Sequence, residues 1–69
     1  MNHRRTQVKA NDGWNDIEFM MLEDKDIFRL FESDGEAVIW EDTDEFIVED
    51  KPFLTEQGIW TVKCNPYYN

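Results

Sequence analysis

Short apolar segments alternate with turn-forming residues along most of this chain. The apolar segments are rich in aromatic and β-branched side chains, and turn signals separate them roughly every ten residues, at 33–36, 41–44 and 55–58. This pattern favours a mainly β fold, an antiparallel meander of four to five strands curled into a small sheet or a partly open barrel. Strands are predicted at 26–32, 37–40, 45–49 and 59–64.

Single residues add detail to two of these strands. Alternation places Trp60, Val62 and Cys64 on one face of the last strand. Pro52 marks either the end of the strand that begins near residue 45 or an edge position, because proline has no N–H to donate to a sheet.

The N-terminal third gives weaker signals. Residues 1–11 are polar and basic and predict a loosely ordered arm, within which 6–10 could add a short edge strand. At 15–23 a capping-box pattern and helical spacing favour a short helix, but the same residues also fit a strand, and the two alternatives stay open. The predicted organisation is therefore a basic arm, 1–11, and one acidic β-rich domain, 12–69.

The composition indicates a folded domain. The chain has 69 residues, of which 41% are hydrophobic and ten are aromatic, whereas disordered acidic tails are poor in aromatic residues. A domain this small has little core, so a homodimer is an open alternative. A single cysteine excludes an internal disulfide. Neither a secretory signal nor a membrane-spanning stretch is present in the sequence, so we expect a soluble, cytoplasmic protein that keeps away from anionic membranes.

The charge is large and unevenly placed. All sixteen acidic residues lie at or after Asp12, where only four Lys or Arg accompany them, so residues 12–69 carry 4 − 16 = −12. Arg4, Arg5 and Lys9 bring the whole chain to −9. Such a surplus of negative charge destabilises the fold through repulsion among the carboxylates. It therefore serves either solubility, beyond what solubility requires, or binding to a partner.

The distribution of the carboxylates favours a working surface. They recur in successive predicted turns with almost no interspersed Lys, and a curled sheet would bring at least two of these turns to one rim. Carboxylates two residues apart on a strand are about 6.6 Å apart, a spacing that can imitate a phosphate backbone. The candidate partner-binding residues are Glu32, Asp34, Glu36, Glu41, Asp42, Asp44, Glu45, Glu49 and Asp50.

Other kinds of site are poorly supported. The only His, Cys and Ser are His3, Cys64 and Ser33, and none has a recognisable activating partner, so no catalytic residue and no enzyme activity are expected. One Cys and one His cannot close a zinc site, and the residues after Asp42 depart from a calcium loop, so no dedicated metal site is expected. The three glycines are isolated, so no cofactor cradle is expected, and direct nucleic-acid binding lacks a basic cluster of sufficient size.

One part of the chain resembles known proteins. The sequence DIFRLFESDGEAV at 26–38, followed by GIWTVKCNPYY at 58–68, resembles small β-proteins of phages and prophages, in which an aromatic strand runs into an Asp-Gly turn and a Trp-containing strand closes the sheet. Size and charge are similar to those of phage early proteins that mimic DNA, a group that includes inhibitors of the nucleoid protein HU, of restriction enzymes and of uracil-DNA glycosylase. Proteins of the HU-inhibiting type are the nearest suggestion within this group.

The resemblance and the charge together predict a DNA-mimic inhibitor that takes part in host takeover. Its carboxylates would occupy the basic surface of a host DNA-binding protein, with HU favoured, and displace DNA without chemistry. The alternative is a small barrel-like protein-interaction module that acts through an exposed aromatic surface, with Trp14 or Tyr67 as candidate contacts.

Overall fold

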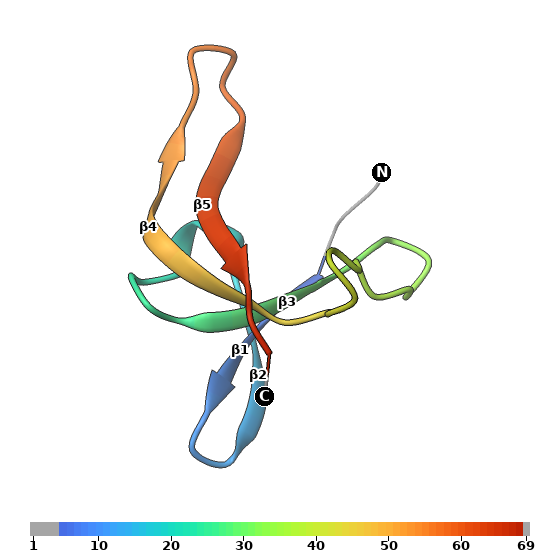
Figure 1. The fold of residues 1–69 in the computed structure, drawn as a ribbon. Coiled ribbons are helices and arrows are strands. Elements are labelled where there is room, and N and C mark those ends of the chain that lie inside the picture. The colour runs from blue at the N-terminus through green and yellow to red at the C-terminus, as the bar shows by residue number, and fades with distance from the viewer. Residues whose placement is uncertain (1–4, 69) are drawn as a thin grey trace.

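Five β-strands form one antiparallel sheet in the computed structural model, which describes residues 5–68 (Figure 1). Their spatial order is β2-β1-β3-β4-β5. A single turn of 3-10 helix, η1 (Phe19–Met21), lies between β2 and β3 in the sequence. The strands are β1 (Arg5–Ala10), β2 (Gly13–Ile17), β3 (Ile27–Phe31), β4 (Phe46–Leu54) and β5 (Trp60–Pro66).

The mainly β fold predicted from the sequence is confirmed. The strands predicted at 26–32, 45–49 and 59–64 correspond to β3, β4 and β5, of which β4 and β5 continue further than predicted. The sheet is open and not closed into a barrel, and its order departs from a simple meander because β3 pairs with β1. In Figure 1 the β1–β2 and β4–β5 hairpins extend in opposite directions from β3.

The strand predicted at 37–40 is reduced to isolated bridges, Phe31 with Ala37 and Trp40 with Thr43. Competition for one edge of β3 explains this difference. β1 occupies the other edge, and β4 pairs with the first two residues of β3 on this one. Only the end of β3 is left for the returning chain, where Val38 N donates to Leu30 O at 2.9 Å.

Residues 5–10 form β1, which is hydrogen-bonded to β2 on one side and to β3 on the other. The strand predicted at 6–10 is confirmed, but its predicted position at the edge of the sheet was wrong. The part of the predicted arm at 1–4 lies outside the described residues. β1 occupies the interior of the sheet because its Thr6 and Val8 face the core. Thr6 is only 5% exposed, and Val8 packs against the core cluster.

The two alternatives for residues 15–23 each hold for a part of the segment. β2 continues to Ile17, and η1 follows directly at Phe19–Met21, where Met21 N donates to Glu18 O at 2.9 Å. The short helical turn ends at Leu22, whose side chain is almost completely buried. The strand followed by the helical turn thus positions the Leu22 side chain in the core.

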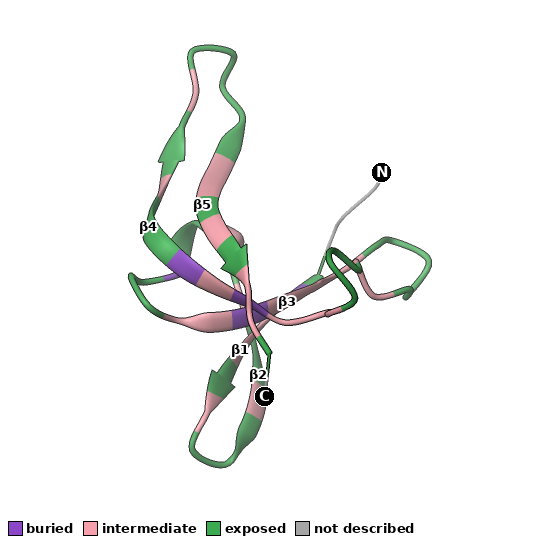
Figure 2. Cartoon of the chain, viewed as in Figure 1, coloured by how far each residue is buried: buried purple, intermediate pink, exposed green. Residues whose placement is uncertain are grey.

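Four buried side chains form the core: Leu22, Phe28, Phe46 and Val48. The rings of Phe28 and Phe46 lie 5.7 Å apart between centroids, and Phe19 meets Phe28 edge-on at 6.5 Å. Figure 2 shows the buried positions where β3 and β4 cross, while the ends of both hairpins are exposed. The fold therefore depends on packing in a small central region.

β4 continues beyond its pairing with β3. Only its first two residues pair with β3, and the rest pair with β5 alone through two register shifts, between Val48 and Asp50 and between Asp50 and Phe53. Pro52 lies in this outer part, where β4 pairs with β5 alone. Of the two alternatives predicted for Pro52, the edge position holds and the end of the strand does not, because β4 continues to Leu54. Such irregularities bend and twist a strand, which fits the curvature of this hairpin in Figure 1. Among residues 5–68 there is no helix long and apolar enough to cross a bilayer.

Replacing Phe28 by Ala should remove most of the stability of the domain. Phe28 is 1% exposed, and truncating a buried Phe to Ala costs about 3–5 kcal/mol, against a total of roughly 3–10 kcal/mol for a domain of this length. Urea unfolding followed by circular dichroism measures the change. Phe53→Ala is the matched control, because Phe53 is 52% exposed on β4 and its loss should cost less than about 1 kcal/mol. Equal losses in the two variants would contradict the assignment of the core.

Candidate acidic interaction surface

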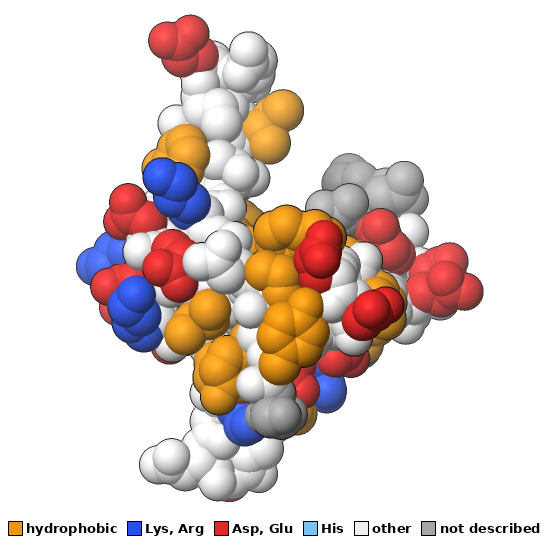
Figure 3. Space-filling model, viewed as in Figure 1, with side chains coloured by type: hydrophobic (Ala, Val, Ile, Leu, Met, Phe, Trp, Pro, Cys, Tyr) orange, Lys and Arg blue, Asp and Glu red, His pale blue; other side chains and the backbone are white. Residues whose placement is uncertain are grey.

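The connection between β3 and β4, residues 32–45, concentrates the charge of the molecule. We call it the acidic loop. It contains seven carboxylates and no Lys or Arg, so its formal charge is −7, and the remainder of the chain carries −9 − (−7) = −2. The loop projects from the sheet in Figure 1, and acidic side chains gather on that side of the molecule in Figure 3. The carboxylates of the acidic loop belong to Glu32, Asp34, Glu36, Glu41, Asp42, Asp44 and Glu45.

Backbone hydrogen bonds fix the first turn of the acidic loop. Glu32 N donates to Glu36 O at 2.8 Å, and Gly35 N donates to Glu32 O at 2.9 Å. The Asp34 carboxylate also accepts from Glu36 N at 3.0 Å. Gly35 has a φ of +92°, which is why a glycine serves at this point. The tight turn predicted at 33–36 is confirmed, and its two acidic side chains, as well as that of Glu32, are exposed.

The second turn of the acidic loop has an unusual backbone. Trp40 and Thr43 exchange N–H···O bonds of 3.0 and 3.2 Å around Glu41 and Asp42, whose φ angles are 54° and 65°. A two-residue hairpin turn of this kind needs positive φ at both central residues and usually has Asn-Gly there. Here two exposed acidic residues take the same conformation.

The residues after β5 hold this turn in place. Thr43 Oγ1 donates to Tyr67 O at 2.8 Å, and Tyr67 N donates to Glu45 O at 2.9 Å. The Tyr68 hydroxyl donates to Glu41 O. Thr43 Oγ1 also accepts from Glu45 N at 3.1 Å. The C-terminal tail thus ties the backbone of the acidic turn to the sheet.

The structure separates Glu49 and Asp50 from the other candidate residues. Both lie on β4, outside the acidic loop, and each has a polar partner there. Glu49 is 3.5 Å from the Lys25 ammonium, and Asp50 accepts from Lys51 N at 3.0 Å. Lys51 in turn lies 3.5 Å from Glu23. Figure 3 shows basic and acidic side chains interspersed beside β4, in contrast to the side of the acidic loop.

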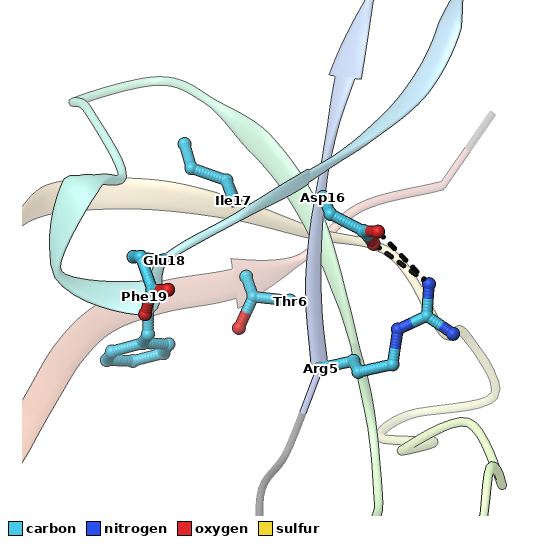
Figure 4. Close-up of a pocket in the computed structure, with 6 residues that line it drawn as sticks. All are labelled: Arg5, Thr6, Asp16, Ile17, Glu18 and Phe19. Carbon is cyan, nitrogen blue, oxygen red and sulfur yellow. Dashed lines mark hydrogen bonds and ion pairs between the residues drawn. The ribbon is translucent and has the colours of Figure 1, made fainter.

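A mixed row of charged and aromatic side chains lies on the face of β1, β2 and β3 opposite the core. The Arg5 guanidinium is 3.0 Å from Asp16, and the bonded pair turns to the side of β1 away from Thr6 and Phe19 (Figure 4). Arg29 lies over the Trp14 ring at 4.2 Å and donates to Gln7 at 2.9 Å. Both arginines are therefore engaged with partners within the sheet.

A hollow lies beside this row. Its volume is about 450 Å³, and its charged lining residues include Arg5 and Asp16. They bind each other, and the hydrogen bond from Arg5 holds the pKa of the Asp16 carboxyl below its usual range. A carboxylate fixed in its ionised form is a weak general base. Within residues 5–68, no three His, Cys, Asp or Glu side chains are arranged so that they could hold a metal ion.

An apolar hollow of about 360 Å³ lies on the core side of the sheet, next to the acidic loop. Figure 3 shows apolar side chains gathered between the β4–β5 hairpin and the acidic loop. Trp40 and Trp60 line the hollow and are 47% and 41% exposed, although the Trp40 ring stacks on Phe46 at 6.3 Å. We call this hollow the apolar groove. It is lined by Phe19, Phe28, Leu30, Val38, Trp40, Phe46, Trp60, Thr61, Val62 and Cys64.

Sequence analysis found only part of this groove. The alternation that places Trp60, Val62 and Cys64 on one face is confirmed, because all three line the groove. Partial burial also raises the pKa of the Cys64 thiol. Trp40 was not identified as a contact residue. Trp14 and Tyr67, which were expected to be exposed, are half-buried.

Removing the Tyr68 hydroxyl should loosen the second turn of the acidic loop. The bond to Glu41 O contributes about 0.5–1.5 kcal/mol, so Tyr68→Phe should speed amide exchange at Trp40 and Thr43 about 2- to 10-fold. Exchange followed by NMR measures this effect. Tyr67→Phe is the control, because Tyr67 contacts the turn through its backbone. Equal acceleration in both variants would show that the Tyr68 hydroxyl does not anchor the turn.

The ion pair between Arg5 and Asp16 predicts a pH dependence. Because the folded pKa of Asp16 is lowered, the pair stabilises the fold above the unfolded pKa of about 3.9, and this contribution is lost as the pH falls through the folded pKa. In Arg5→Gln the NMR-titrated pKa of Asp16 should therefore rise. Lys9→Gln removes the same charge from β1 without breaking the Asp16 hydrogen bond, so it should move this pKa less. Equal shifts would contradict the role of the hydrogen bond.

Comparison of the chain with known protein families, with curated proteins and with solved structures gave no match. The candidate function therefore rests on the acidic loop and the apolar groove themselves.

Proposed function

We propose that this chain is a DNA mimic that inhibits a DNA-binding protein. In this proposal the acidic loop occupies the basic DNA-binding surface of its partner and displaces the DNA. The observation that carries the proposal is the concentration of seven carboxylates without a single Lys or Arg in 14 consecutive residues. A DNA duplex also presents a dense series of negative charges, about one per 1.7 Å of its axis. The resemblance to phage early proteins makes a nucleoid protein such as HU, in the cytoplasm of a host cell, the favoured target.

The contrast with the rest of the surface supports a binding role over solubility alone. Surfaces that serve solubility mix both signs of charge. Outside the acidic loop this chain has such a surface, because Asp16, Glu23 and Glu49 each lie within 4 Å of a Lys or Arg. The acidic loop contains no Lys or Arg of its own, so its formal charge of −7 is not offset within residues 32–45.

The fixed geometry of the loop also favours binding. Each of its two turns is held by backbone hydrogen bonds, and the second is tied to the C-terminal tail. A surface ordered before binding loses less conformational entropy when it meets a partner. Attraction between opposite charges accelerates such an encounter and makes the complex sensitive to salt.

The apolar groove favours a second candidate function. A small protein-interaction module would bind through exposed aromatic side chains, and Trp40 and Trp60 supply them, in place of the expected Trp14 and Tyr67. Binding of this kind would survive high salt, since burial of apolar surface does not depend on charge screening. Salt dependence therefore distinguishes the two functions.

Neutralising the exposed part of the acidic loop should abolish inhibition. We expect the unmodified chain to displace a fluorescent duplex from HU, with affinity falling at least about tenfold between 50 and 200 mM salt. The triple variant E36Q/E41Q/D42N should lose most of this affinity, because it removes three unpaired exposed charges and none of the side-chain bonds described for the loop. Fluorescence anisotropy measures both effects.

The control for this experiment is D12N/E18Q/E56Q, which removes three exposed carboxylates from outside the acidic loop. It has the same net charge as the loop variant and should keep most of the affinity. Two results would contradict the proposal. In the first, HU keeps its DNA at excess inhibitor, and in the second, the two variants lose affinity equally.

A further inference from the structure

The acidic loop and the apolar groove form one continuous surface. Val38 and Trp40 belong to the loop by sequence, and both line the groove. Trp60 and Val62 of β5 line it as well, and so does Leu30 of β3. A partner that reaches the carboxylates of the loop therefore also meets exposed aromatic side chains. A DNA mimic that binds through charge alone would not require an apolar groove beside its carboxylates.

The lining of the groove specifies the apolar part of its occupant. Eight of its ten lining side chains are those of Phe, Leu, Val and Trp, and the other two are Thr61 and Cys64, which carry no formal charge at neutral pH. Its volume of about 360 Å³ lies in the range of pockets that bind ligands. Apolar side chains are the groups that such a surface accommodates without leaving polar atoms unpaired.

The charge of the acidic loop determines which kind of partner can place apolar side chains in the groove. A second copy of this chain carries −9, and pairing through the groove would bring two acidic loops of −7 close together. An anionic lipid surface would be repelled in the same way. A segment with Lys or Arg beside its apolar residues would be attracted by the loop and could fill the groove. Basic amphipathic segments combine these two features.

We propose that the apolar groove and the acidic loop together bind a basic amphipathic segment of the partner protein. Its apolar side chains insert between Trp40 and Trp60, and its Lys and Arg side chains face the carboxylates of residues 32–45. The inference rests on the proposed function, because it describes the part of the DNA-binding partner that the acidic loop engages. It adds a requirement for apolar contacts that DNA mimicry alone does not make.

Three synthetic peptides of equal charge test the inference. The first has Leu at positions i, i+3, i+4 and i+7 among Lys residues, the second has the same composition without an apolar face, and the third is oligolysine. The amphipathic peptide should bind at least about tenfold more tightly than the other two, because each buried Leu adds apolar contact area. Isothermal titration calorimetry measures the affinities.

Two variants locate the apolar contact. Trp60→Thr should remove the preference for the amphipathic peptide and leave binding of oligolysine unchanged, since it alters the groove and not the loop. The control Phe53→Thr changes an exposed aromatic residue on the other strand of the same hairpin, outside the groove lining, and should keep the preference. NMR spectra establish that both variants are folded.

Alkylation of Cys64 tests the groove in the unmodified chain, so the inference can be contradicted even if Trp60→Thr does not fold. Cys64 lines the groove and is half-buried. The amphipathic peptide should slow its reaction with iodoacetamide, and oligolysine should not. Equal protection by both peptides would overturn the inference.

The outcomes also separate the inference from the proposed function. If the amphipathic peptide and oligolysine bind with equal affinity, and E36Q/E41Q/D42N loses binding of both, the role of the apolar groove is contradicted. The proposed DNA mimicry is not contradicted by that result. If the affinity for the amphipathic peptide changes neither with salt concentration nor in E36Q/E41Q/D42N, both the combined binding surface and the proposed DNA mimicry are contradicted. Protection of Cys64 that grows with the concentration of the chain alone would identify a second copy as the occupant. Protection by anionic vesicles would identify a lipid surface, and either result would overturn the inference.

Discussion

The contact between Phe28 and Phe46 joins two halves of the molecule that otherwise share little. Strand pairing across this boundary is limited to two residue pairs, Ile27 with Ile47 and Phe28 with Phe46. Just beyond them, Lys25 N donates to Val48 O and Val48 N donates to Asp26 O. Four large side chains packed at this crossing hold the β1–β2–β3 unit against the β4–β5 hairpin. Because so few pairs connect the halves, the sheet can bend there, and the apolar groove lies on the core side of the bend.

The same boundary explains where the charge is placed. The acidic loop is the covalent connection between the two halves, since it leaves β3 and enters β4. Repulsion among the seven carboxylates of the acidic loop destabilises its two tight turns. Hydrogen bonds between the C-terminal tail and Thr43, Glu45 and Glu41 oppose that repulsion without adding any positive charge. The loop can therefore be both ordered and strongly acidic.

Most of the strands were predictable because their signals are local. Aromatic and β-branched residues over 26–32 and 59–64 predict strands, and Asp34-Gly35 predicts the turn between two segments. The position of β1 was not predictable in this way. Its sequence, RTQVKA, is mostly polar, and only its register with β3 shows that Thr6 and Val8 face the core while Gln7 reaches Arg29 on the other face.

The candidate surface was predictable in composition but not in extent. Counting carboxylates over 41–50 groups Glu49 and Asp50 with the loop, yet Lys25, from a distant segment, neutralises the first of them. Trp40 was missed because it lies in a segment read only as a strand, where no alternation marks its exposure. The turn at Glu41 and Asp42 has a further consequence for laboratory evolution. Its positive φ angles would suit Asn-Gly better than two acidic residues. Selection for thermal stability alone would therefore replace Glu41 and Asp42, and the resulting domain would be more stable but would carry less negative charge on the loop.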